Sequence, residues 1–366
     1  MLLLGIILGM TTQLLAADAS LKPAELGKKA LTVLASETWN KDAEVRTAAV
    51  TAWGKIGNPA PAPLKILHAS LHDRNAHVRV ESAFALHLLG DDSGVPVIAR
   101  IVRPSTAAAE NLEPEQEAKL VMRAKSRVRG IRRLTEIGGV EAVKIFESLL
   151  NDPSGEVRDA TNIALAKMIP GEGFDAPFFT AVTDPDENVR AAALRALAEI
   201  GSGPALDALN AAAGDPSYIV REEAMRALSS FSSPETVRLL ARGAKDQDKR
   251  VAAQALSGLA HIPDGQTTAL LKEIMNGSKA VEVQLKTMAG LARRGDKVGV
   301  ELADQALKQK DPDLRALGLD VLEAVEGDQS NALLLRTLED DKDGKLRVKA
   351  ALILVLRLTR KEGPSR

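Results

Sequence analysis

The stretch DPDENVRAAALRALAEIG, from Asp184 to Gly201, has the features of one complete amphipathic helix. Asp184 suits an N-cap, because its carboxylate can accept the free amide hydrogens of the first turn. Pro185 suits the first helical position, and Glu187 completes a capping box. Gly201 can adopt the left-handed conformation that ends a helix. The apolar stripe comprises Val189, Ala193, Ala196, Leu197 and Ile200, which follow the 3.6-residue period of a helix.

The same stripe recurs along the chain at a nearly constant interval. From residue 157 onward its first positions are Val157, Val189, Val220, Val251, Val283, Leu314 and Leu346, each 31 or 32 residues after the one before. Shorter apolar segments, such as PALDALNAAA at 204–213, lie between the copies and predict a second helix in each unit. A fixed period of this length is typical of stacked helical repeats, in which each pair buries its stripe against its neighbours.

The repeated pattern D-x-x-x-x-V-R-x-x-A-x-x-A-L-x-x-I-G resembles the HEAT repeat, in the bacterial variety shared with phycobilin-lyase HEAT-like domains. The similarity covers roughly residues 23 to 360. It implies an all-α, right-handed α-solenoid (superhelix) of about ten HEAT-like helix pairs, with the second helix of each pair lining the concave side. Because this family is defined by its shape, the resemblance does not fix a function.

In that family, the Asp and the Arg of the pattern are implied to form a ladder between adjacent repeats. The corresponding positions here are Asp73, Arg79, Asp152, Arg158, Asp184, Arg190, Asp215, Arg221, Asp341 and Arg347. Three positions depart from the pattern, since Ala252 and Gln284 replace the Arg and Ser278 replaces the Asp. The ladder is therefore expected to be interrupted around the seventh and eighth repeats.

The composition favours one long repeat array. Of 366 residues, 45% are apolar but only 2% are aromatic, so the core must consist mainly of Ala, Leu, Val and Ile. The net charge of −1 gives no electrostatic argument for nucleic acid as a partner. The absence of cysteine from the sequence excludes disulfides, thiol catalysis and lipoprotein acylation.

The first 19 residues differ from the rest and are interpreted as a secretory signal peptide. Met1–Leu15 is uncharged and rich in Leu, Ile and Gly, and Ala17-Asp18-Ala19 has the small-x-small form of a signal-peptidase site. An uncleaved N-terminal anchor is the alternative, although about fifteen apolar residues are few for a bilayer span. The sequence thus predicts a periplasmic or secreted protein, with a solenoid over 20–360, a short polar tail at 361–366, and no integral membrane span after signal cleavage.

An insertion interrupts the third repeat. The interval between first positions grows to nearly 50 residues after Val78, and the extra material is the loop at 104–114, with STAAAENLE between two prolines. Loops inserted into repeat arrays often lie at a functional face, and a tolerated insertion without a function is the alternative.

A basic segment, KLVMRAKSRVRGIRR at 119–133, follows this loop and contains no acid. Its partner-binding candidates are Arg123, Lys125, Arg127, Arg129, Arg132 and Arg133, which could bind an acidic protein segment, a polyanion or anionic lipid. The alternative is a solvated helix whose cations pair with Glu110, Glu113, Glu115 and Glu117. No aromatic residues alternate with the cations, which weakens a nucleic-acid interpretation.

The last helix, 346–358, is apolar on more than one face. A terminal repeat normally turns a polar face outward. Self-association or a partner bound at this end is therefore one hypothesis, and coverage by the following tail is the other.

The sequence shows no catalytic motif, and no cofactor is expected. His68, His72, His77 and His87 cluster in the second repeat, but the bland interpretation as surface histidines is preferred to a metal site. The run Glu339–Gly344 resembles a calcium loop until its twelfth position, which is Ala350 instead of the required Glu, and it is interpreted as a turn in which Asp341 caps the last helix.

The sequence therefore predicts a non-catalytic HEAT-repeat scaffold that binds a protein through its concave surface. A lyase or accessory factor resembling phycobilin-lyase HEAT proteins is the alternative, and an alkylbase glycosylase on a HEAT scaffold is a third. The apparent signal peptide argues against both enzymes.

Overall fold

The computed structural model describes residues 22–57, 61–104, 114–201, 203–231, 233–262, 265–277, 281–294 and 299–361. Within these ranges the chain forms twenty α-helices, one short 3-10 helix and no strand. The predicted signal segment 1–19, most of the inserted loop, Ser278 and most of the tail lie outside them. The predicted all-α solenoid of about ten helix pairs is confirmed.

The pairs divide between two compact units, of which unit 1 comprises residues 1–58 and 263–366 and unit 2 residues 59–262. Unit 1 contains α2 (Pro23–Glu37) with α3 (Ala43–Ile56), α16 (Gly265–Gly277) with α17 (Val281–Ala292), α18 (Val300–Leu307) with α19 (Pro312–Ala324), and α20 (Asp328–Asp340) with α21 (Gly344–Lys361). Unit 2 contains α4 (Pro61–Ser70) with α5 (Ala76–Leu88), the 3-10 helix η1 (Asp92–Gly94) and α6 (Val95–Val102) with α7 (Pro114–Ile137), α8 (Val140–Glu147) with α9 (Gly155–Met168), α10 (Ala176–Ala181) with α11 (Glu187–Ile200), α12 (Gly203–Ala212) with α13 (Tyr218–Leu228), and α14 (Pro234–Gly243) with α15 (Lys249–His261).

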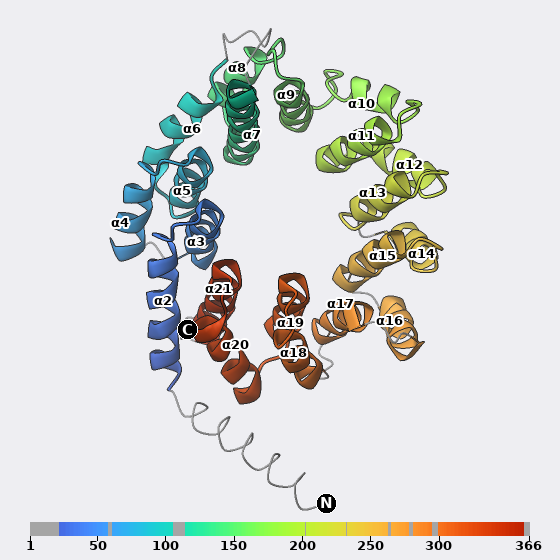
Figure 1. Cartoon of the computed structure of the whole chain (residues 1–366). Coiled ribbons are helices and arrows are strands. Elements are labelled where there is room, and N and C mark those ends of the chain that lie inside the picture. Colours follow the sequence, from blue (N-terminus) through green and yellow to red (C-terminus); the bar gives the residue numbers. More distant parts are fainter. Residues whose placement is uncertain are drawn as a thin grey trace, which may run out of the picture. The chain divides into compact units, whose positions relative to one another are not determined.

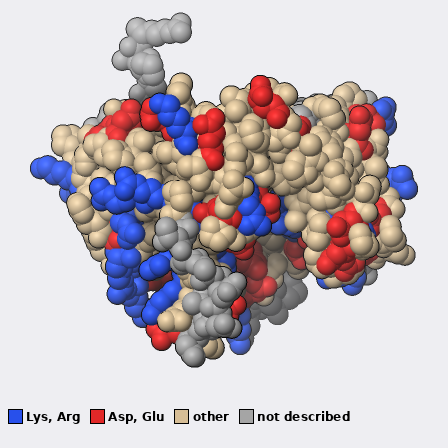
Figure 2. Space-filling view, turned by 90° about the horizontal axis from the view of Figure 1, so that it is seen from above, with Lys and Arg blue, Asp and Glu red and all other residues tan. Residues whose placement is uncertain are grey.

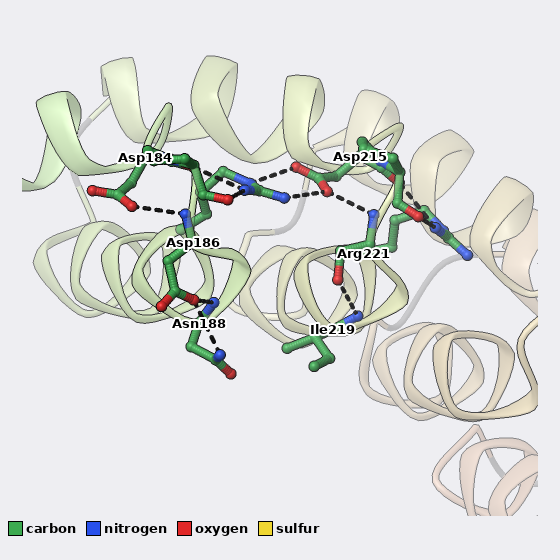
Figure 3. Close-up of polar contacts among 10 residues, drawn as sticks. Asp184, Asp186, Asn188, Asp215, Ile219 and Arg221 are labelled. Atoms are coloured by element: carbon green, nitrogen blue, oxygen red, sulfur yellow. Dashed lines mark hydrogen bonds and ion pairs between the residues drawn. The ribbon is translucent and has the colours of Figure 1, made fainter.

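Helix α11 ends as predicted but begins two residues later than predicted. Gly201 adopts the left-handed conformation, with φ of 74°. The N-cap is Asp186, whose Oδ1 accepts the Asn188 amide hydrogen at 2.8 Å, and Asp184 instead accepts the Asp186 amide hydrogen, also at 2.8 Å (Figure 3). The predicted capping box is therefore wrong. Asp341 likewise precedes Asp343, which accepts the Lys345 amide hydrogen at the start of α21.

The reason for this shift is an arginine one turn into the helix. Nη1 of Arg190 donates to the backbone carbonyls of Asp184, at 2.8 Å, and Pro185, at 3.1 Å. A carbonyl bound in this way holds its residue in a turn before the helix. We call this pair of contacts the turn hydrogen bonds.

The buried face of α11 is wider than the predicted stripe. Ala193, Ala196 and Leu197 are buried as expected, and Ala191 and Leu194 are buried too. Val189, the first position of the predicted stripe, is instead 39% exposed. The cause is that second helices of neighbouring pairs pack on one another, as α11 does on α13 and α13 on α15 (Figure 1). Each second helix thus contacts both its own first helix and its neighbours, which stabilises the fold by about 1.5–3 kcal/mol per fully buried large side chain.

The apolar last helix, α21, is covered within the chain. It packs against α2 and α3 of unit 1, and α2 lies beside it in Figure 1. The covered side chains include Ile353, Leu354 and Val355. Neither the tail nor a second copy of the chain is needed to bury this face. Self-association stays a prediction, but the exposed apolar face that suggested it is not observed.

Charged pairs also join the two ends of the sequence in unit 1. Lys345 Nζ donates to Glu44 at 2.8 Å, and Lys29 pairs with Glu339. Gly344 leaves room for this contact, because a Cβ at that position would lie 2.8 Å from one Val45 methyl and 2.9 Å from the other. In the part of the chain that the structure describes, no helix is long and apolar enough to cross a membrane.

Candidate functional site

Arginine and aspartate side chains of neighbouring repeats pair with one another and form a ladder. Nε and Nη2 of Arg190 donate to Asp215 at 3.0 and 2.9 Å (Figure 3). Arg221 contacts Asp246 in the same way at 2.8 and 3.1 Å. In both pairs the acid follows the arginine by 25 residues and lies in the turn of the next repeat. We call such a pair a filled rung. Its two parallel hydrogen bonds are the strong geometry for arginine and carboxylate.

Further filled rungs among the described residues include Arg127 with Asp152, Arg315 with Asp341, and Arg347 with Glu37. The resemblance supplied Asp152, Asp341 and Arg347, but Arg127, Asp246, Arg315 and Glu37 were missed as ladder members. The 25-residue spacing would have found Arg127, which stands 25 residues before Asp152.

Two of the ladder carboxyls, Asp215 and Asp246, are held ionised. The hydrogen bond from Arg221 lowers the pKa of Asp246, and burial only partly opposes it. Burial raises the pKa of Asp215, but the hydrogen bonds from Arg190 and from the Ser217 amide outweigh it, so the net direction is also downward. These aspartates therefore remain charged partners at any pH near neutrality.

Two predicted ladder arginines have no such acid. Arg79 makes the turn hydrogen bonds, from Nη1 to the carbonyls of Asp73 at 2.7 Å and Arg74 at 3.2 Å, and Arg158 makes them to Asp152 and Pro153. Over the described ranges, Nε and Nη2 of Arg79 and of Arg158 have no acceptor, and Asp184 does not contact Arg158. We call each of these an unfilled rung.

The unfilled rung at Arg79 opens into a cavity of about 1300 Å³ in unit 2. The cavity is lined by α5, α6 and α7 and by the turn before α9. Arg100, Arg103 and Arg123 line it together with Arg79, and none of these four makes an ion pair within the described structure. Figure 2, which is seen from above relative to Figure 1, shows several Lys and Arg side chains gathered on one part of the surface.

The cavity wall also carries apolar and acidic groups. Val121 and Met122 of α7 are 44% and 49% exposed, although both are large and apolar. Asp152 lines the cavity but is already paired with Arg127, which leaves Glu117 and Glu156 as the remaining acids of the wall. The cavity therefore presents an excess of positive charge beside an apolar surface.

The structure separates the six partner-binding candidates of the basic segment into two groups. Arg129 and Arg133 contact Glu81, at 3.3 and 2.8 Å, and Arg132 contacts Glu199 at 3.2 Å. Arg127 has a side chain only 7% exposed and belongs to the ladder. Arg123 and Lys125 are exposed and form no ion pair among described residues.

The acids that pair with this segment differ from those expected. Glu81 of α5 and Glu199 of α11 come from other repeats, whereas Glu115 pairs with Lys119 on the same helix. Glu110 and Glu113 lie outside the described residues. Arg129, Arg132 and Arg133 are thus paired with acids, as the alternative expected, but these acids come from other repeats of unit 2.

The four histidines are placed individually. His68 contacts Asp91 at 2.8 Å and His87 contacts Asp92 at 2.5 Å, while His72 is exposed. Burial, helped by nearby Arg129, lowers the pKa of His77. Where the structure describes the chain, no three His, Cys, Asp or Glu side chains come together as metal ligands.

Comparison with protein families identifies part of the array. A family model of HEAT repeats matches residues 176–260. This segment is a run of HEAT repeats. No curated protein matches the chain by sequence.

Solved structures with similar helical repeats include three worth naming. An engineered protein is 19% identical with a TM-score of 0.32 and covers 93% of this chain and 99% of its own. Human deoxyhypusine hydroxylase in complex with glycerol is 16% identical with a TM-score of 0.32, over 74% and 97%. The CpcE–CpcF complex of phycocyanin lyase from Nostoc is 20% identical with a TM-score of 0.38, over 70% and 94%. Scores this low extend none of their activities to this chain.

Proposed function

We propose that this protein is a non-catalytic scaffold that binds another protein, with the arginine-lined cavity of unit 2 as its binding site. The supporting observation is that four cavity arginines, Arg79, Arg100, Arg103 and Arg123, lack a carboxylate partner among described residues. Elsewhere in the ladder, Arg190, Arg221 and Arg315 are paired with acids. A partner protein can supply both the missing carboxylates and an apolar surface for Val121 and Met122.

The proposal includes a place in the cell. The uncharged, Leu-rich Met1–Leu15 and the sequence Ala17-Asp18-Ala19 support export to the periplasm or exterior. N-terminal sequencing of the protein from an exported fraction should begin near Ser20. A cytoplasmic product that retains Met1 would contradict export and would favour the lyase or accessory-factor alternative, which needs a cytosolic pigment-protein as its substrate.

The scaffold function is tested by affinity capture from an envelope extract. The variant Arg100→Glu, Arg103→Glu, Arg123→Glu reverses cavity charges without touching a filled rung. The control Arg242→Glu, Lys245→Glu, Lys249→Glu makes the same change in charge on exposed residues of α14, α15 and the turn between them. We expect a protein captured by the wild type to be lost with the cavity variant and retained with the control. Equal capture by all three would contradict the proposal.

A further inference from the structure

We propose that the unfilled rung at Arg79 is a carboxylate receptor, which binds an Asp or Glu side chain of a partner polypeptide in the way that other rungs bind an acid of the next repeat. This inference rests on the proposed scaffold function and names the chemistry that the partner must bring.

Arg79 is already held in the orientation of a rung arginine. Its Nη1 contacts to the carbonyls of Asp73 and Arg74, at 2.7 and 3.2 Å, match those of Arg221 to the carbonyls of Asp215 and Pro216, at 2.9 and 3.0 Å. Nε and Nη2, the atoms through which Arg190 and Arg221 bind their acids, thus have no acceptor among the described residues. Because the turn hydrogen bonds fix the side chain beforehand, a ligand would not bear the full cost of ordering it.

The missing acid has a cause in the sequence. The position 25 residues after Arg79 is Pro104, and it follows Arg103, so the turn that supplies the acid elsewhere supplies a cation here. The inserted loop begins at this point, and α7 does not start until Pro114. The position that supplies the acid in a filled rung therefore carries no carboxylate here, at the point where the insertion begins.

A rung can be filled by an acid that does not belong to the next repeat in sequence. Arg347 of the last repeat binds Glu37 of the first, 310 residues away, with Nε donating at 2.6 Å. The acid is a glutamate, so the geometry also accepts the longer side chain. The arginine evidently selects a carboxylate delivered to the right position, whatever segment delivers it.

The surroundings of Arg79 favour a peptide over a simple anion. Arg100, Arg103 and Arg123 line the same cavity and add positive charge, while Val121 and Met122 expose apolar surface beside them. An acidic segment with apolar residues next to its Asp or Glu would use both features. A phosphate group would gain nothing from the apolar wall.

Arg158 provides a matched control. It makes the same turn hydrogen bonds, at 2.6 and 3.2 Å, and has no acid partner among the described residues, but it does not line the cavity. Arg79→Gln and Arg158→Gln therefore remove the same local contacts, but only Arg79→Gln removes a guanidinium group that lines the cavity. Arg79→Lys keeps the charge without the planar pair of donors.

The experiment measures fluorescence anisotropy of a labelled peptide in which Asp alternates with Leu, against a matched peptide with Asn for Asp. With the wild-type chain at low salt, we expect the Asp peptide to bind at least about tenfold more tightly than the Asn peptide. Arg79→Gln and Arg79→Lys should each lose about tenfold in affinity for the Asp peptide, and Arg158→Gln less than about twofold. Thermal melting followed by circular dichroism should show the two Gln variants equally folded.

Three results would overturn the inference. They are equal binding of the two peptides, equal losses in Arg79→Gln and Arg158→Gln, and full retention of binding by Arg79→Lys. Tripolyphosphate that displaces the Asp peptide at a lower concentration than unlabelled Asp peptide does would also overturn it, because the site would then be one for phosphate. A further outcome is that peptide affinity is unchanged in Arg79→Gln while the triple cavity variant still loses its captured protein. That result would contradict the carboxylate receptor and leave the scaffold function supported.

Discussion

The repeats around α11–α15 and those around α5–α7 have an arginine at the equivalent position, but its contacts differ. Arg190 and Arg79 are oriented by the same turn hydrogen bonds, but only Arg190 finds a carboxylate in the following turn. The orientation of the arginine depends on two backbone carbonyls, six and five residues before it, whereas its partner comes from the next repeat. An insertion can therefore convert a structural arginine into a binding group without moving it.

The most buried filled rung should give the largest effect. Asp152→Ala leaves Arg127 without its acid at a site where the two side chains are only 7% and 0% exposed. Removing one member of a buried ion pair costs about 3–5 kcal/mol in the free energy of unfolding. Urea denaturation followed by circular dichroism measures this loss, and Glu156→Ala, an exposed acid of α9, is the control. An unchanged midpoint would show that the rung contributes nothing to stability.

The contact between the first and last repeats should be the next most sensitive. Gly344→Ala places a methyl group against Val45, and overpacking of this kind costs about 1–3 kcal/mol. Gly203→Ala, where no atom lies within 4 Å of the new Cβ, should be nearly neutral. Thermal melting of the two variants makes the measurement. If both melt together, the packing of α3 against α21 does not depend on close contact at this glycine.

The filled rungs also predict a dependence on pH. The hydrogen bond from Arg221 lowers the folded-state pKa of Asp246 from its ordinary value of 3.8. A lowered pKa stabilises the fold fully above the unfolded-state value, and the contribution is lost as pH falls through the folded-state value. The stability difference between the wild type and Asp246→Asn should thus shrink as the pH is lowered from about 5 toward 2. A difference that stays constant over this range would assign the stabilisation to something other than ionisation.

The sequence was sufficient for the repeat architecture because periodicity is a property of many residues at once. It misplaced the helix start at Asp184, because the turn hydrogen bonds of Arg190 join a side chain to the backbone and leave no signature in capping preferences. Arg127 was hidden in a run of cations, although it follows Ser126 at the first position of its stripe, as the ladder arginines do. The pair Arg347 and Glu37 could not be predicted, since 310 residues separate its members.

The smallest expected effect is the most specific test of the unfilled rung. Arg79→Gln and Arg158→Gln each remove only turn hydrogen bonds, so their free energies of unfolding should agree within about 0.5 kcal/mol. Arg190→Gln removes the same contacts and also leaves Asp215 without its cation, which should cost about 1–3 kcal/mol more. Urea denaturation of the three variants, in parallel, measures both differences. A loss at Arg79 as large as that at Arg190 would mean that Arg79 already has a carboxylate partner inside the protein, and a partner polypeptide would then have no free donors to bind.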